Sequence, residues 1–282
     1  MNKTLKVILP LAFIAFLLST TMVRADYNVT VGNTFDYDVV ASNWNISSGS
    51  DSSTGTGFSF LEVNRAVGST FTVEVLTVDT NLGVDWEMTL GAATDTGNNN
   101  PFDALGIALS LFLPIILSMG TISWNQTAVD LGPGINELFF LDTEIGELFF
   151  QLTNETFVES LSDPNYVFNN VFGTFENSTN VAVFVWHFDM TMTSGTTNLG
   201  GTFVWQIAYD QTTGQLKGYY MDMDYSGSFA GIPITYQFEQ KVEEVGYNLP
   251  GVGGFIPGFE WFIAVPALAL LGGVAVIIKK RK

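Results

Sequence analysis

The chain of 282 residues contains no cysteine and only one histidine, His187. The lack of cysteine excludes disulfide frameworks, cysteine-based zinc sites and thiol nucleophiles. A zinc site with a single histidine would also need several carboxylates converging on it. A glycine-rich phosphate loop and a nucleotide-binding fingerprint are both missing. We therefore expect neither a metal nor a cofactor.

Basic residues are scarce as well. The chain has 10 Lys and Arg against 28 Asp and Glu, which gives a formal net charge of -18. Between residues 26 and 259 the basic side chains are Arg65, Lys217 and Lys241. Such an acidic surface repels nucleic acids and anionic membrane surfaces, so no nucleic-acid partner is expected.

The N-terminus has the pattern of a signal peptide. Lys3 and Lys6 precede an apolar run over residues 7–18, which is short for a membrane-spanning helix. Val23-Arg24-Ala25 offers small residues at the two positions that a signal peptidase reads. We expect cleavage after Ala25, with an uncleaved signal anchor as the alternative.

The C-terminus has the pattern of a membrane anchor. Residues 261–278 carry no charge and are long enough to cross a bilayer, and four basic residues follow at 279–282. Basic residues beside a span stay cytoplasmic, which predicts a plasma-membrane protein with an extracellular ectodomain and a cytoplasmic C-terminus. The expected domains are a signal peptide over 1–25, an extracellular β domain over 26–247, a Gly/Pro tether over 248–258 and a transmembrane tail over 259–282.

The same tail resembles the PGF-CTERM type of archaeal sorting signal. That signal combines a Pro-Gly-Phe motif, a hydrophobic span and a basic end, here Pro257-Gly258-Phe259 followed by residues 261–278 and 279–282. The resemblance implies recognition by an archaeosortase, removal of the span and attachment of the mature protein to membrane lipid. Glu260 directly after the motif departs from that pattern, and a retained span is the alternative.

Five Asn-x-Ser/Thr acceptors predict glycosylation on exposed parts of an exported domain. They are Asn28, Asn45, Asn125, Asn154 and Asn177.

Alternation of apolar and polar residues predicts a mainly β domain. Val84 to Leu90 and Phe35 to Val39 alternate without a fault, as half-buried antiparallel strands do. Short turn-rich links favour an antiparallel meander that forms a curved sheet, a half-barrel or a sandwich. The serine- and glycine-rich residues 42–57 and the residues 94–100 are predicted to be loops.

Two stretches without this alternation predict one or two helical inserts. Residues 104–129 are uncharged, and their apolar residues over 104–119 favour a helix laid over the sheet, interrupted at Pro114. A second membrane span is the alternative for this stretch. Residues 136–161 contain Glu-Leu-Phe-Phe twice, and we expect a hairpin or a short helical pair there.

Large apolar side chains gather on one face of the predicted strands. Aromatic and Met side chains fill cores, but they also line adaptable apolar pockets. A curved sheet needs a helix, a ligand or a partner on its concave face, so the alternatives are a plain core and a ligand cavity closed by residues 104–119. The candidate pocket residues are Trp86, Met88, Trp186, Trp205, Tyr219, Met221, Met223 and Tyr236.

Catalytic signals are weak by comparison. Asp222 and Asp224 share a strand face, as do Asp36 and Asp38, and paired carboxylates can hydrolyse glycosides. Alternating aspartates are ordinarily a solvated face, and His187 beside Asp189 is more typical of an ion pair than of a catalytic base. No catalytic residue is assigned.

The outer domain also resembles two groups of proteins. Residues 31–37, Val-Gly-Asn-Thr-Phe-Asp-Tyr, and the hairpin Tyr209 to Leu216 are similar to archaeal surface proteins of the choice-of-anchor kind. The hairpin is also similar to one in LolA-type half-barrel lipoprotein carriers, which implies a curved sheet that holds acyl chains.

Together these features predict a membrane-anchored surface protein with a non-enzymatic binding module for an apolar, lipid-like ligand. A structural or adhesive envelope protein is the alternative, and a carboxylate-based carbohydrate hydrolase is a distant one.

Overall fold

The computed structural model describes residues 27–79, 82–100, 103, 125–142, 166–178 and 180–251, with the backbone alone for 166–178. These residues are mainly β, as predicted, and their long strands pair antiparallel. The predicted signal peptide, residues 104–119 and the tail from residue 252 lie outside the described residues. Within the described part, no helix is long and apolar enough to span a membrane.

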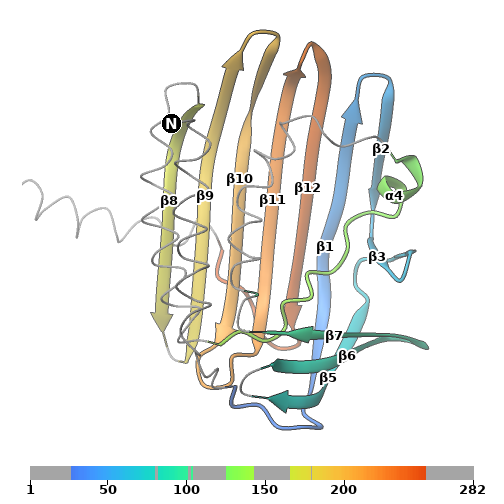
Figure 1. The fold of residues 1–282 in the computed structure, drawn as a ribbon, viewed down its shortest axis with the longest axis vertical. Coiled ribbons are helices and arrows are strands. Elements are labelled where there is room, and N and C mark those ends of the chain that lie inside the picture. The colour runs from blue at the N-terminus through green and yellow to red at the C-terminus, as the bar shows by residue number, and fades with distance from the viewer. Residues whose placement is uncertain are drawn as a thin grey trace, which may run out of the picture. The chain divides into compact units, whose positions relative to one another are not determined.

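Ten strands form one sheet in the order β7-β6-β5-β1-β12-β11-β10-β9-β8, with β2 also paired to β1 (Figure 1). Their bounds are β1 Thr34–Ser48, β2 Asp51–Thr56, β5 Thr70–Asp79, β6 Gly83–Leu90, β7 Ala93–Asn99, β8 Tyr166–Ser178, β9 Val181–Ser194, β10 Thr197–Asp210, β11 Leu216–Phe229 and β12 Ile232–Glu244. A separate hairpin joins β3 Phe58–Phe60 to β4 Val63–Arg65, and the short helix α4 spans Gln126–Asp130.

The sheet forks at β1. One edge of β1 pairs with β12, while the other pairs with β5 over Thr34 to Asp38 and with β2 over Asn43 to Ser48. A bulge between Val39 and Ala41 separates the two halves, and such bulges bend a strand and increase its twist. In Figure 1, β5, β6 and β7 run across the direction of β8 to β12.

The prediction of loops at 42–57 and 94–100 is wrong, because both stretches pair as strands within β1, β2 and β7. These strands are polar in composition because the side chains on one of their faces contact solvent, while the other face carries a glycine where an apolar residue would be expected. Gly55 lies opposite Trp44 and Gly97 opposite Trp86, and each indole lies directly over its glycine. A missing side chain, rather than a flexible backbone, explains these glycines.

Residues 136–142 form no helix and no regular strand, and the remainder of the stretch where a hairpin or helical pair is predicted, residues 143–161, lies outside the described residues. This segment lies alongside the β10–β11 turn and is hydrogen-bonded to it. The Leu141 N–H donates to the Gly214 carbonyl at 2.8 Å, and the Leu216 N–H donates to the Phe139 carbonyl at 2.8 Å. The Phe139 ring packs against Trp86 at 4.9 Å between centroids. The segment therefore forms part of the core.

The core continues along β9 and β10. The rings of Phe188 and Phe203 lie 5.0 Å apart, and those of Trp186 and Trp205 lie 6.2 Å apart. All four residues are buried. Aromatic pairs at these separations stabilise a core beyond the area they bury.

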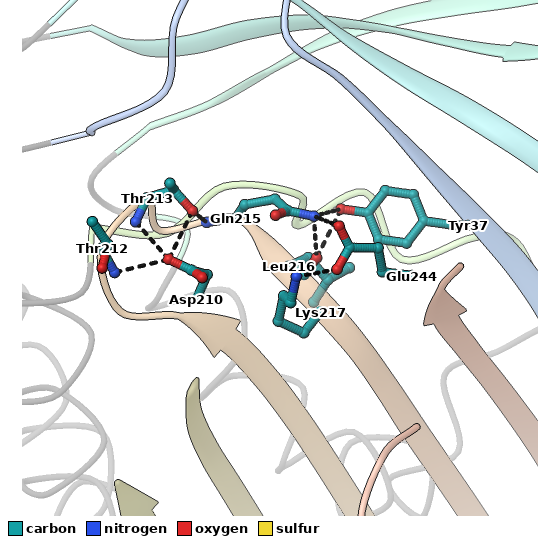
Figure 2. Close-up of polar contacts among 8 residues, drawn as sticks. All are labelled: Tyr37, Asp210, Thr212, Thr213, Gln215, Leu216, Lys217 and Glu244. Carbon is teal, nitrogen blue, oxygen red and sulfur yellow. Dashed lines mark hydrogen bonds and ion pairs between the residues drawn. The ribbon is translucent and has the colours of Figure 1, made fainter. Parts of the chain in front are cut away.

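The β10–β11 hairpin predicted at Tyr209 to Leu216 is present, and its turn lies at the lower end of the sheet in Figure 1. Figure 2 shows the polar contacts of this turn. Asp210 Oδ1 accepts hydrogen bonds from the backbone N–H groups of Thr212 and Thr213, both at 2.9 Å. Gly214 has a φ of 72°, a left-handed turn conformation that glycine adopts without steric cost.

Beside this turn, a buried polar network joins three strands (Figure 2). The Tyr37 hydroxyl donates to the Leu216 carbonyl at 2.8 Å, and Gln215 Nε2 donates to Tyr37 Oη at 3.2 Å and to Glu244 Oε1 at 3.0 Å. Glu244 also forms an ion pair with Lys217. The network fixes β1, β11 and β12 to one another at this end.

The chain divides into two compact units at residue 248. The first ends at Asn248, one residue beyond the predicted end of the outer domain, and contains every strand of the described residues.

Candidate functional site

One face of the sheet carries most of the predicted pocket residues; we call it the inner face. Strand pairing aligns Trp186, Trp205, Met221 and Gln240 across β9 to β12. The row on one side of it contains Tyr219 and the row on the other contains Met223. The predicted residues brought together here are Trp186, Trp205, Tyr219, Met221, Met223 and Tyr236.

Four of these six side chains are buried, whereas Met221 and Tyr236 are partly exposed. Trp86 and Met88 lie on β6, in the part of the sheet beyond β1, and both are 1% exposed. Trp86 packs on Phe139 and Gly97. These two predicted residues therefore belong to a different part of the core.

Gln240 is a polar residue of the inner face that the sequence prediction missed. It occupies an apolar position of the alternation in β12, between Phe238 and Val242, and is 2% exposed. Its Oε1 atom accepts a hydrogen bond from the Tyr219 hydroxyl at 2.7 Å, and Tyr219 Oη accepts one from the Asn136 N–H at 3.0 Å. The sequence contained one signal for this residue, namely a glutamine at a position of the strand alternation where an apolar residue is expected.

Among the described residues of β10, β11 and β12, three buried polar atoms on the inner face have no hydrogen-bond partner. They are Trp205 Nε1, Tyr225 Oη and Gln240 Nε2. Burial raises the pKa of Tyr225, and the charge of Asp189 raises it further, so its hydroxyl stays protonated at neutral pH. Buried polar groups are ordinarily paired, because leaving one unpaired costs about 1–3 kcal/mol.

The opposite, outer face of the sheet is hollowed by a polar groove of about 540 Å³. Side-chain amides bridge its strands, because Asn45 Nδ2 donates to Gln237 Oε1 at 2.7 Å and Gln237 Nε2 donates to Asp224 Oδ1 at 3.1 Å. The lining residues whose strand register puts them on the outer face are Asn43, Asn45, Thr54, Thr56, Tyr220, Asp222, Asp224, Gln237 and Glu239.

Two carboxylates lie side by side in this groove. Asp222 on β11 and Glu239 on β12 are direct cross-strand partners. Burial raises the pKa of Asp222, and the charge of Glu239 raises it further, while a hydrogen bond from Tyr220 lowers it. Asn43 Nδ2 donates to Glu239 Oε2 at 2.6 Å. The pair is therefore better suited to holding a proton than to binding an anion.

The other predicted carboxylates are engaged by neighbouring side chains. Asp36 and Asp38 accept hydrogen bonds from the hydroxyls of Thr72 and Thr70. His187 Nε2 lies 3.4 Å from Asp189 Oδ1, in agreement with the predicted pair. Across the described part of the chain, no group of three or more His, Asp or Glu side chains is placed to hold a metal ion.

The predicted glycosylation sites differ in their surroundings. Asn28, Asn45 and Asn125 are exposed, but Asn45 lies within β1 and its Nδ2 already donates to Gln237. Asn125 caps α4, because its Oδ1 accepts a hydrogen bond from the Ala128 N–H at 3.3 Å. Asn177 lies on β8, and Asn154 lies outside the described residues.

Comparisons with protein-family models, with curated proteins and with solved structures found no match to this chain. Its function is therefore inferred from its own residues and their geometry.

Proposed function

We propose that the chain is an exported surface protein whose acidic β domain is held at the plasma membrane by its C-terminal tail. The pattern of residues 1–25, the Gly/Pro tether and the basic end at 279–282 support this location. Pro257, Gly258 and Phe259 make the tail a substrate for an archaeosortase, which would exchange the span for a lipid anchor.

The proposed activity of the domain is non-enzymatic binding of an apolar, lipid-like ligand on the inner face. One observation carries this proposal: the strand register places Trp186, Trp205 and Met221 in one row, with Tyr219 and Met223 in the rows beside it. Flexible Met side chains among aromatic rings can adapt to an apolar molecule. The sheet would then act as a half-barrel, as in the LolA-type carriers that the β10–β11 hairpin resembles.

The test begins with the full chain, made in membranes and carrying a protease site inserted after Asn248. Cleavage releases the folded domain, and native mass spectrometry determines whether an apolar molecule stays bound. We expect a bound species in the natural protein and much less in Met221→Glu, which places a carboxylate on the inner face. Val31→Glu is the control, because Val31 is 60% exposed. A bare domain in every sample would contradict the proposal and favour a structural or adhesive role.

The outer groove supports a second candidate function, hydrolysis of a carbohydrate. Asp222 and Glu239 are adjacent across two strands, where opposed Cβ atoms lie about 4.5–5.5 Å apart, and the raised pKa of Asp222 suits a group that donates a proton. Loss of activity on a polysaccharide panel in Asp222→Asn, but not in Asp36→Asn, would support it. A natural protein without activity on that panel would exclude those substrates.

A further inference from the structure

The unpartnered atoms of the inner face are hydrogen-bond donors. Trp205 Nε1 and Gln240 Nε2 can each donate a hydrogen bond but cannot accept one. The orientation of the Gln240 amide follows from Tyr219: its hydroxyl accepts from the Asn136 N–H and donates its own hydrogen to Gln240 Oε1. This arrangement uses the Gln240 oxygen and leaves its NH₂ group without an acceptor.

These donors are close enough together to serve one ligand. Trp205 and Gln240 occupy the same row, separated by Met221, so their backbones lie about 10 Å apart, two strand spacings. Tyr225 lies on the neighbouring strand β11, two rows further along the same face. The three residues are 1%, 2% and 4% exposed, so bulk water does not satisfy them.

The surrounding charge selects a neutral acceptor. Among the causes that raise the pKa of Tyr219 and of Tyr225 are the negative charges of Glu137 and Asp189 respectively. Within the described residues, Lys217 and Lys241 are each paired with a glutamate, and Arg65 lies on β4 in the separate β3–β4 hairpin. An anionic head group on the inner face would be buried within reach of these negative charges and without a basic partner among the described residues, which is far more costly than burying a neutral carbonyl.

We infer that the inner face recognises a neutral, carbonyl-bearing lipid, such as an ester or a ketone, whose oxygens accept hydrogen bonds from Trp205, Gln240 and Tyr225. This inference rests on the proposed binding of an apolar ligand and specifies its chemical class. The apolar part of the ligand would lie along Met221 and Met223, and its carbonyl groups would face the three donors.

The test compares three probes on the domain released from the full chain, delivered from cyclodextrin at pH 8. Methyl palmitate and heptadecane have the same number of carbon atoms, and palmitate carries a negative charge. We expect methyl palmitate to bind about 3- to 10-fold more tightly than heptadecane, as expected for one net hydrogen bond, and palmitate to bind more weakly than the ester.

Substitutions locate the effect. At least one of Tyr225→Phe and Trp205→Phe should reduce the preference for the ester while heptadecane binding is retained. The Tyr225 change deletes a single oxygen from a folded core. Trp86→Phe is the matched control, because its Nε1 is also buried and unpartnered but lies on β6. Circular dichroism verifies folding.

The outcomes separate the two ideas. Equal binding of ester and hydrocarbon, or an ester preference unchanged in both variants, overturns the inference while leaving apolar binding intact. Failure of all three probes, with no bound molecule in the natural protein, overturns the proposed function itself.

Discussion

The Trp44 indole lies over Gly55, its direct partner on β2, so closely that a Cβ atom at residue 55 would be 2.5 Å from Trp44 Cζ2. Gly132 approaches the same ring, where a Cβ atom would be 2.5 Å from Cζ3. Trp44 Nε1 donates to Ser53 Oγ at 3.0 Å, and that hydroxyl donates to Asp130 Oδ1 at the end of α4 at 2.7 Å. One tryptophan thereby joins β1, β2 and the segment around α4.

Replacement of Gly55 by Ala should therefore destabilise the protein by about 1–3 kcal/mol, the usual cost of overpacking a core. Gly97→Ala should do the same, because a Cβ atom there would be 2.3 Å from Trp86 Cζ2. Thermal unfolding of the full chain measures both changes. Gly134→Ala is the control, because a Cβ atom at residue 134 meets nothing within 4 Å. Equal melting temperatures for all three variants would contradict this account.

Two buried tyrosines give a second prediction. Tyr37→Phe removes a hydroxyl that donates to Leu216 and accepts from Gln215, and should cost about 1 kcal/mol of unfolding free energy. Tyr27→Phe should be neutral or stabilising, because the buried Tyr27 hydroxyl has no partner among the described residues. Chemical denaturation compares the two directly, and a larger loss in Tyr27→Phe would reverse the assignment.

The pH dependence of stability provides a third prediction. Burial and the charge of Glu239 raise the pKa of Asp222 in the folded protein, so ionisation of this group reduces stability as the pH rises through that pKa. Asp222→Asn should therefore raise the melting temperature at pH 7, and the gain should disappear below pH of about 4, where aspartate is protonated in both states.

Asp85 provides a comparison of opposite sign. Hydrogen bonds from Thr77 and Asn98 lower the pKa of Asp85 in the folded protein, so its contribution to stability is present above its ordinary pKa and is lost as the pH falls through the lowered value. Asp85→Asn should lower the melting temperature at pH 7. The same sign of change in both variants would show that loss of charge alone, rather than local geometry, governs stability.

The ends of the chain give a fourth prediction, tested by intact mass spectrometry of protein from a host with an archaeosortase. We expect a mature N-terminus at Asp26 and loss of residues 261–282. Replacing Pro257, Gly258 and Phe259 with alanine should prevent processing, so that the protein keeps the mass of its full tail. Val252→Ala is the control, because it leaves the motif intact and the tail should still be removed. A natural protein that extends to Lys282 would indicate a retained span.

Much of the sheet could be predicted from its alternation, because side chains of a strand point to opposite faces with a period of two. The strands in 42–57 and 94–100 could not be predicted, because these stretches have the composition of turns. Their glycines Gly55 and Gly97 instead leave the space that the rings of Trp44 and Trp86 occupy. Gln240 was missed for a related reason: its hydrogen-bond partner, Tyr219, lies on the neighbouring strand β11 and is far from it in the sequence.

The sequence alone determined the acidic, cysteine-free composition, the expected export and anchoring, and the β periodicity that places bulky residues on one face. These are local or compositional properties. Only the tertiary structure decided that Trp186, Trp205 and Met221 share a row, that Asp222 lies beside Glu239, and that Trp205, Tyr225 and Gln240 leave buried donors unpaired. Strand order and register are set by contacts between distant parts of the chain, and no local pattern encodes them.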